Sequence, residues 1–193
     1  FLSELRIAID TRVRNSPARV RRAYRDRRDL RVNIGCGAEG HPGWVNVDVI
    51  PVDGVNCIYD CRTGLPFADA SVRGIFTEHF FEHIDYTEEV PRFLAECHRA
   101  LVPGGVMRII VPDGEKYLRA YCADGWDDLA VVRRLKPDHS DAHFGSRFHT
   151  KMEVVNASFR QYFEHKFAYD FATLEFVLRR YGFTDVQLSL IHI

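Results

Sequence analysis

The stretch EHFFEH, residues 78–83, places two histidines four positions apart, with a glutamate directly before the second. On one face of a helix, His79 and His83 would ligate zinc while Glu82 acts as general base, which is the chemistry of a zinc hydrolase. That chemistry needs both histidines on one helix and a third ligand. Residues 74–79 have the pattern of a buried strand that ends there, which puts the two histidines on different elements. We therefore predict that this motif binds no metal.

A second chemical motif, GCGAEG at residues 35–40, satisfies the G-x-G-x-x-G pattern of a dinucleotide site. A pyrophosphate at such a loop needs a helix that begins at once, so that its N-terminus faces the phosphates. Here His41, Pro42 and Gly43 break the chain, and the next strand begins at Trp44. The loop therefore disfavours a pyrophosphate and, with it, a nicotinamide-dependent oxidoreductase.

A nucleoside without a pyrophosphate suits the same loop better. It needs close backbone approach over Gly35 and Gly37, but not a helix dipole. Asp48, at the end of the second strand, is placed to accept both ribose hydroxyls, and Asp60, after the third, to accept the adenine amino group. Taken singly, each carboxylate is better explained as an ordinary strand-end or cap residue. Their order around one sheet edge favours the nucleoside site.

Short apolar runs alternate with helical patterns after residue 30. We expect strands at 31–34, 44–49, 56–59, 73–77, 106–111 and 183–186, and helices at 88–101, 115–123, 127–135, 151–163 and 170–181. Strands that alternate with helices predict a mostly parallel α/β sheet with right-handed crossovers. The helical stretch 114–164 follows a sheet strand, and such an insertion usually covers a site.

The composition fits one soluble domain. The chain has 193 residues, 46% of them hydrophobic, with a formal net charge of -1. No apolar run approaches the roughly 20 residues of a membrane span. Its five cysteines are odd in number and contain no C-x-x-C pair. We interpret them as reduced thiols and expect a cytoplasmic protein.

The two ends of the sequence differ from the middle. Residues 1–31 hold ten arginines against four acidic residues, so we expect a basic helical segment over 1–30. A pair of solvated helices is favoured over a weak contact with an anionic surface. Residues 188–193 read LSLIHI, the in-frame translation of a transposon-end sequencing adapter. We hypothesise adapter read-through, and genomic DNA that encodes these residues with other codons would refute it.

Seven motifs, taken in order, resemble the class I S-adenosylmethionine-dependent methyltransferases, and within them the short-helix, type 11-like group. They are NIGCG (33–37), PGWVNVD (42–48), LPFADASV (65–72), EHFFEHI (78–84), RALVPGGVMRIIVPD (99–113), HKFAYDF (165–171) and GFTDV (182–186). The ordered set covers residues 31–187 and is specific, whereas one such motif would be weak.

The resemblance implies a Rossmann-like sheet with helices on both faces, and a helical substrate lid over 114–164 after the fifth strand. It implies that S-adenosyl-L-methionine is the co-substrate within a methyltransferase domain at 31–187. The last strand of the family should follow Val186 and is missing, which we attribute to C-terminal truncation. The strand near Val186 is therefore expected to be poorly paired. The acidic residue that many relatives carry in the first strand is Asn33 here.

The resemblance also assigns cofactor-binding roles. Gly35, Cys36 and Gly37 would line the methionine part. Asp48, with Val49 beside it, would hold the ribose, and Asp60 with Cys61 would flank the adenine. Thr77 and Glu78 would lie at the end of the fourth strand, where cofactor and acceptor meet.

Methyl transfer needs in-line placement of the acceptor and, for a hydroxyl acceptor, a general base. His79 is the first candidate and Asp113 the second. Four residues of the polar stretch after 138 are candidates to contact the acceptor, a small molecule or a saccharide: His139, His143, Arg147 and His149. A solvated loop is the favoured alternative for that stretch, and a metal contact with Asp141 is another. Other functions left open are a non-catalytic S-adenosylmethionine-binding protein and a zinc hydrolase. A nucleic-acid acceptor is disfavoured, because no base-binding motif is present.

Overall fold

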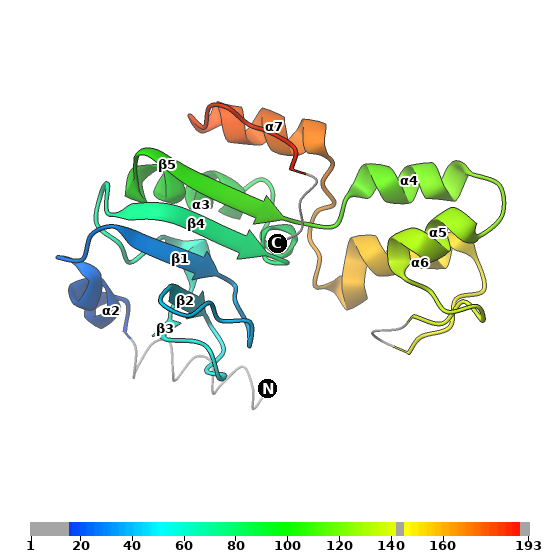
Figure 1. Cartoon of the computed structure of the whole chain (residues 1–193), viewed down its shortest axis with the longest axis horizontal. Coiled ribbons are helices and arrows are strands. Elements are labelled where there is room, and N and C mark those ends of the chain that lie inside the picture. The colour runs from blue at the N-terminus through cyan, green and yellow to red at the C-terminus, as the bar shows by residue number, and fades with distance from the viewer. Residues whose placement is uncertain (1–15, 142–144, 190–193) are drawn as a thin grey trace.

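The computed structural model describes residues 16–141 and 145–189. Within them, one sheet holds five parallel strands in the order β3-β2-β1-β4-β5 (Figure 1). The strands are β1 (Leu30–Ile34), β2 (Val45–Asp48), β3 (Cys57–Ile58), β4 (Val72–Glu78) and β5 (Leu101–Ile110). The predicted mostly parallel α/β sheet is therefore confirmed.

Helices connect and cover these strands. They are α2 (Pro17–Tyr24), α3 (Glu89–Ala100), α4 (Gly114–Cys122), α5 (Asp127–Arg133), α6 (Lys151–Arg160) and α7 (Phe171–Arg180). The described residues also form three short 3-10 helices, η2 (Cys61–Thr63), η3 (Phe81–His83) and η4 (Gln161–Phe163). None of the helices in the described part of the chain is both long enough and apolar enough to span a bilayer.

The core of the sheet follows from its apolar pattern. Strands β1, β2 and β4 bury Val32, Ile34, Val47 and Val72 completely, as expected for parallel strands covered on both faces. Helix α3 buries its apolar residues at helical spacing, namely Val90, Phe93, Leu94 and Cys97. These side chains belong to the same apolar cluster as the strands, and α3 lies behind β4 and β5 in Figure 1.

The insertion between β5 and α7 forms its own small lobe. Helices α4, α5 and α6 lie beyond the carboxyl ends of β4 and β5 (Figure 1). Their buried side chains make a second apolar cluster, separate from the sheet core and centred on Tyr117, Leu129 and Val154. The lobe rejoins the sheet where Gly114 N donates a hydrogen bond to Tyr169 O (2.7 Å).

The strand predicted at 183–186 is wrong, because these residues form no strand. The backbone N–H of Phe183 instead returns to Leu178 O at the end of α7 (3.1 Å). A strand needs a neighbour to satisfy its ladder, and none of the described strands lies there. Two predictions concern residues that the structure does not describe. They are the helical pattern over residues 1–15 and the adapter read-through at residues 190–193.

Candidate functional site

The carboxyl ends of β1 and β4 define the candidate site. Strand β1 leads to β2 on one side, while β4 pairs with β1 on the other side. The strand order therefore reverses between β1 and β4, and open α/β sheets bind ligands in the crevice at that position. The helical lobe also lies at the carboxyl ends of the strands (Figure 1).

The glycine loop that follows β1 is held without a helix. No helix is present between residues 35 and 44, as predicted from the break at His41–Gly43. The backbone N–H groups of Gly35 and Cys36 both donate to Val47 O in β2 (2.8 and 3.2 Å). The loop is thus fastened directly to the neighbouring strand.

Two glycines of this loop have a left-handed backbone but different surroundings. A Cβ on Gly35 (φ 69°) would come within 2.6 Å of Phe80 Cβ, so the loop packs against the residues that follow β4. Around Gly37 (φ 48°), no described atom lies within 4 Å of where a Cβ would be. This open surface is what close approach of a ligand to the backbone requires.

Asp48 lies against the glycine loop. Its Oδ2 accepts a hydrogen bond from Gly37 N (2.9 Å), and its Oδ1 accepts one from Ile50 N (2.9 Å). Two backbone amides therefore fix the carboxylate, while lone pairs remain on each oxygen for further donors. Val49, the next residue, is half-buried at the same strand end.

Buried asparagines hold this edge, a role that the sequence analysis missed. Asn33 in β1 is 2% exposed and donates from Nδ2 to Glu39 O (3.0 Å), across the glycine loop. Asn46 in β2 accepts from His41 N and donates to His41 O (2.9 and 3.0 Å). A buried amide needs such partners. An asparagine inside an otherwise apolar strand was the available signal.

Asp60 lies after β3, as the sequence indicated, but its carboxylate already has a partner. Arg62 pairs with it through Nε to Oδ1 (2.9 Å) and through a second guanidinium nitrogen to Oδ2 (2.8 Å). Burial opposes ionisation of Asp60, but the hydrogen bonds and charge of Arg62 outweigh it and lower the pKa. An adenine amino group would have to share this carboxylate with Arg62.

The two cysteines assigned to the site are buried thiols. Burial, followed by the charge of Asp48, raises the pKa of Cys36 to about 11. Burial also raises the pKa of Cys61 well above its ordinary value. Both are therefore protonated near neutral pH, so they can line a cofactor but are not nucleophiles.

The end of β4 supplies three polar residues of different exposure. Thr77 is fully buried, and its hydroxyl has no hydrogen-bond partner among the described residues. Glu78 is exposed. His79 follows with a left-handed backbone (φ 51°) and a side chain that is 63% exposed. A non-glycine residue in this conformation is unusual and tends to occur at functional sites.

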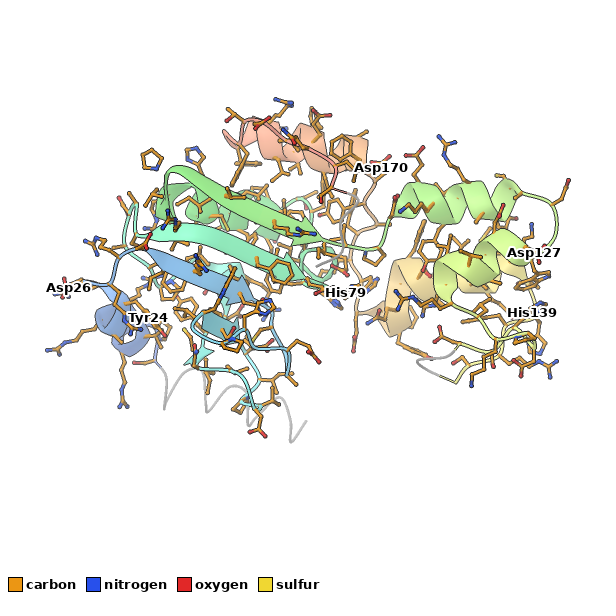
Figure 2. All side chains as sticks on the ribbon, in the orientation of Figure 1. Tyr24, Asp26, His79, Asp127, His139 and Asp170 are labelled. Atoms are coloured by element: carbon orange, nitrogen blue, oxygen red, sulfur yellow. The ribbon has the colours of Figure 1, made fainter. Side chains whose placement is uncertain are left out.

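His79 is oriented by Glu82. Its Nδ1 lies 3.1 Å from Glu82 Oε1, so the ring nitrogen donates to the carboxylate. This hydrogen bond raises the pKa of His79 above its ordinary value, although partial burial opposes the shift. Figure 2 shows His79 at the carboxyl end of the sheet, on the side that faces the helical lobe.

The HFFEH motif is not a helix. His79 follows β4, whereas Glu82 and His83 belong to η3, so the two histidines lie on different elements as predicted. Glu82 lies in the first turn of η3. Its side chain is 2% exposed and lies 3.9 Å from His165 Nε2. Nothing local in the sequence connects residue 82 with residue 165.

Asp113 has a structural task in this conformation. Its Oδ1 accepts hydrogen bonds from Glu115 N (3.1 Å) and Lys116 N (3.3 Å), which caps the N-terminus of α4. Its part in catalysis stays a prediction.

Three of the residues predicted to contact the acceptor, His139, Arg147 and His149, belong to the far loop of the helical lobe. His139 stacks on Trp126 (ring centroids 3.9 Å apart), and Figure 2 shows it on the opposite side of the lobe from His79. Arg147 Nε donates to Asp138 O (3.1 Å), and His149 is exposed beside Glu153. His143 lies outside the described residues.

The helical lobe also contains a buried ion pair and a cleft. Asp141 is buried and pairs with Arg133 (2.7 Å). A cleft of about 420 Å³ opens on the same lobe, lined mainly by apolar atoms of α6, η4 and residues 146–150. It lies apart from the glycine loop, so it is not the cofactor site described above.

Parts of the chain are similar to known proteins. Residues 53–109 match the family model described as a methyltransferase domain. A stretch of 65 residues is 42% identical to malonyl-[acyl-carrier protein] O-methyltransferase 1 of Coxiella burnetii, covering 33% of this chain and 22% of that protein. Phosphoethanolamine N-methyltransferase 2 of Haemonchus contortus, solved in complex with S-adenosyl-L-methionine, aligns over 92% of this chain and 44% of its own at 14% identity, with a TM-score of 0.43.

Residues 53–109 are therefore similar to a methyltransferase domain, and the glycine loop lies at the carboxyl edge of a parallel sheet. The match to the curated relative spans about a fifth of that protein's length. S-adenosyl-L-methionine, the methyl donor of S-adenosylmethionine-dependent methyltransferases, fits the residues present. Gly37 offers an open backbone surface, Asp48 a fixed carboxylate and Thr77 an unpartnered buried hydroxyl.

Proposed function

We propose that this chain transfers a methyl group from S-adenosyl-L-methionine to a small-molecule or saccharide acceptor. The observation that carries the proposal is the pairing of the open backbone at Gly37 with the Asp48 carboxylate, 2.9 Å from the Gly37 amide. A nucleoside placed there meets a surface for close approach and an acceptor for its ribose hydroxyls.

The cofactor would occupy the edge formed by the ends of β1, β2 and β4. Its sulfonium supplies an already activated methyl group. Gly35, Cys36 and Gly37 would lie along the methionine part, and Asp48 with Val49 beside the ribose. Asp60 and Cys61 would lie beside the adenine, and Thr77 and Glu78 would lie where the cofactor meets the acceptor. The protein's task is then to hold the acceptor in line with the methyl group, which is a proximity effect.

His79 is the candidate that would receive a proton from a hydroxyl acceptor. It lies at the end of β4, it is exposed on the side of the helical lobe, and Glu82 fixes its ring. Asp113 is the second candidate, although it caps α4 in this conformation. The helical lobe at 114–164 would act as the substrate lid, with His139, His143, Arg147 and His149 as its candidates for acceptor contact.

The test is transfer of isotopically labelled methyl groups from S-adenosyl-L-methionine to a panel of hydroxylated small molecules and saccharides. We expect label on at least one acceptor. His79→Gln should then lower turnover of a hydroxyl acceptor about 10²–10⁴-fold and leave the affinity for S-adenosylhomocysteine unchanged. Affinity for the cofactor product without transfer to any acceptor would favour the non-catalytic binding protein instead.

A further inference from the structure

Three side chains outside the cofactor edge converge on one buried point. They are Glu82 and His83 of η3 and His165, which lies between η4 and α7. Each offers one ligand atom, and these atoms lie within 4.8 Å of one another. The side chains of Glu82 and His165 are only 2% and 4% exposed, and the His83 ring meets the His165 ring edge-on at 4.7 Å.

The tautomer of His165 is set by its other nitrogen. Nδ1 lies 2.8 Å from Ser158 O, and since a carbonyl oxygen only accepts, Nδ1 must donate. Nε2 is therefore the ring nitrogen left to bind a ligand, and it faces Glu82 Oε1 at 3.9 Å.

The second carboxylate oxygen of Glu82 has no hydrogen bond that would offset the cost of its burial. Oε2 is buried and has no hydrogen-bond partner among the described residues, while Oε1 accepts from His79 Nδ1 (3.1 Å). A buried carboxylate oxygen without a partner is costly. The Glu82 carboxylate lies beside the His83 and His165 nitrogens, and this arrangement suits a positively charged occupant.

We propose that Glu82, His83 and His165 bind one divalent transition-metal ion of the zinc type. Two imidazole nitrogens and one carboxylate are a donor set that zinc accepts, and they exclude Mg²⁺ and Ca²⁺, which prefer oxygen ligands. Ligands 2.0–2.2 Å from zinc lie about 3.3–3.5 Å apart at the tetrahedral angle. The Glu82–His165 pair would need to close by only a few tenths of an ångström, and His83, which is half-buried, is freer to turn.

The surroundings of the site are those of a metal centre. Ligating histidines usually donate their other ring nitrogen to a carbonyl or carboxylate, as His165 does to Ser158 O. The backbone already joins the two segments, because Lys166 N donates to Glu82 O (2.8 Å). The ion would fasten η3, and with it His79, to the chain that returns from the helical lobe. This role is independent of the proposed methyl transfer.

The test uses the full chain with any affinity tag removed, in a Cys122→Ser background, because Cys122 is an exposed thiol that would bind zinc by itself. The metal-stripped protein is dialysed against Zn²⁺ and its metal content is measured. We expect one equivalent of zinc, and a melting temperature about 5–10 °C higher at a hundred times the dissociation constant. Co²⁺ should give the visible absorption of a tetrahedral or five-coordinate site.

The variants Glu82→Gln, His83→Gln and His165→Gln should each weaken zinc binding by at least tenfold, the smallest loss typical of even an outer-shell change. His98→Gln removes an exposed histidine elsewhere and should change nothing. Absence of stoichiometric zinc in the parent protein would overturn the proposal, and so would binding that the three variants retain. If the Glu82 and His165 variants do not fold, zinc binding by the His83→Gln variant, which changes a half-buried residue, tests the proposal in the same way.

Discussion

At the scale of single residues, Gly35 is expected to matter for folding and Gly37 for ligand binding. Both have a positive φ, which costs a residue with a Cβ about 1–2 kcal/mol. Only Gly35 also faces a neighbour, since its Cβ would lie 2.6 Å from Phe80 Cβ. One position is therefore closed by the protein itself, and the other is open to a ligand.

This difference predicts two distinct outcomes. Gly35→Ala should lower the free energy of unfolding by about 2–5 kcal/mol, because overpacking adds to backbone strain. Gly37→Ala should cost about 1–2 kcal/mol of stability, yet weaken S-adenosylhomocysteine binding at least tenfold. Urea unfolding and calorimetry measure the two quantities.

Gly125→Ala is the matched control, because Gly125 has a similar φ of 68° and open surroundings among the described residues but lies in the helical lobe. It should reproduce the stability cost of Gly37→Ala without a loss of affinity. Equal affinities for the Gly37 and Gly125 variants would show that no ligand approaches Gly37.

Residue positions at the site were predictable where they follow a strand. Asp48 was expected at the end of the second strand beside the glycine loop, and it lies there because a strand fixes the direction of the chain. The burial of Glu82 beside His165 was not predictable, because the two residues lie far apart in the sequence. Contacts between residues so far apart in the sequence leave no local pattern.

At the scale of elements, α3 holds the loop that leads into β4. Glu96 Oε2 accepts from Leu65 N (2.9 Å), and Arg99 pairs with both oxygens of Glu96 (2.8 and 2.9 Å). Arg99 also donates to Phe67 O (3.0 Å). The LPFADASV motif is thus fixed to the helix by one carboxylate and one guanidinium group.

The pH dependence of stability follows from this pair. The hydrogen bonds from Arg99 lower the pKa of Glu96, although partial burial opposes the shift. A lowered folded-state pKa stabilises the fold above the unfolded-state pKa, and this stability is lost as the pH falls through the folded-state value.

Glu96→Gln should therefore cost about 1–2 kcal/mol at pH 7, and the difference from the parent should shrink in acid. Urea unfolding from pH 7 down to about pH 3 measures this. Glu175→Gln, which removes a partly exposed pair with Arg179 in α7, is the control and should cost under about 1 kcal/mol. A cost of Glu96→Gln that stays constant with pH would contradict the assignment.

The elements themselves were largely predictable from apolar periodicity. Strands at 31–34, 73–77 and 106–111 and the helix at 88–101 agree with the structure to within a few residues, except that β5 already begins at Leu101. The pairing of β4 with β5 shifts register between Val72 and Gly74, and this shift accommodates the extra residues Pro103–Gly105 of β5. No strand forms at 183–186, where the sequence analysis already expected a strand to be poorly paired for lack of its neighbour.

At the scale of the whole molecule, the described residues form two apolar cores. The sheet core and the core of the helical lobe share no residues. The lobe is tied to the sheet by Gly114 and Tyr169 and through Glu82 and Lys166. Because the core of the lobe is small, we expect the lobe to have a lower local stability than the sheet.

Leu129→Ala tests this division. Leu129 is fully buried in the lobe core, so its truncation should cost that core about 2–5 kcal/mol. Hydrogen exchange should accelerate over residues 114–163 and stay slow in β1 and β4, while S-adenosylhomocysteine still binds. Uniform acceleration across the sheet would show that the two cores unfold as one.

The most direct test of the account is calorimetric titration of S-adenosylhomocysteine into metal-stripped protein, with NADH as the control ligand. We predict binding of S-adenosylhomocysteine alone, weakened about 10–100-fold by Asp48→Ala because the ribose hydroxyls lose their acceptor. Asp53→Ala, which removes an exposed carboxylate nearby, should bind as the parent does. A folded protein that does not bind S-adenosylhomocysteine, or an Asp48→Ala variant that binds it undiminished, would contradict the assignment of this edge as the cofactor site.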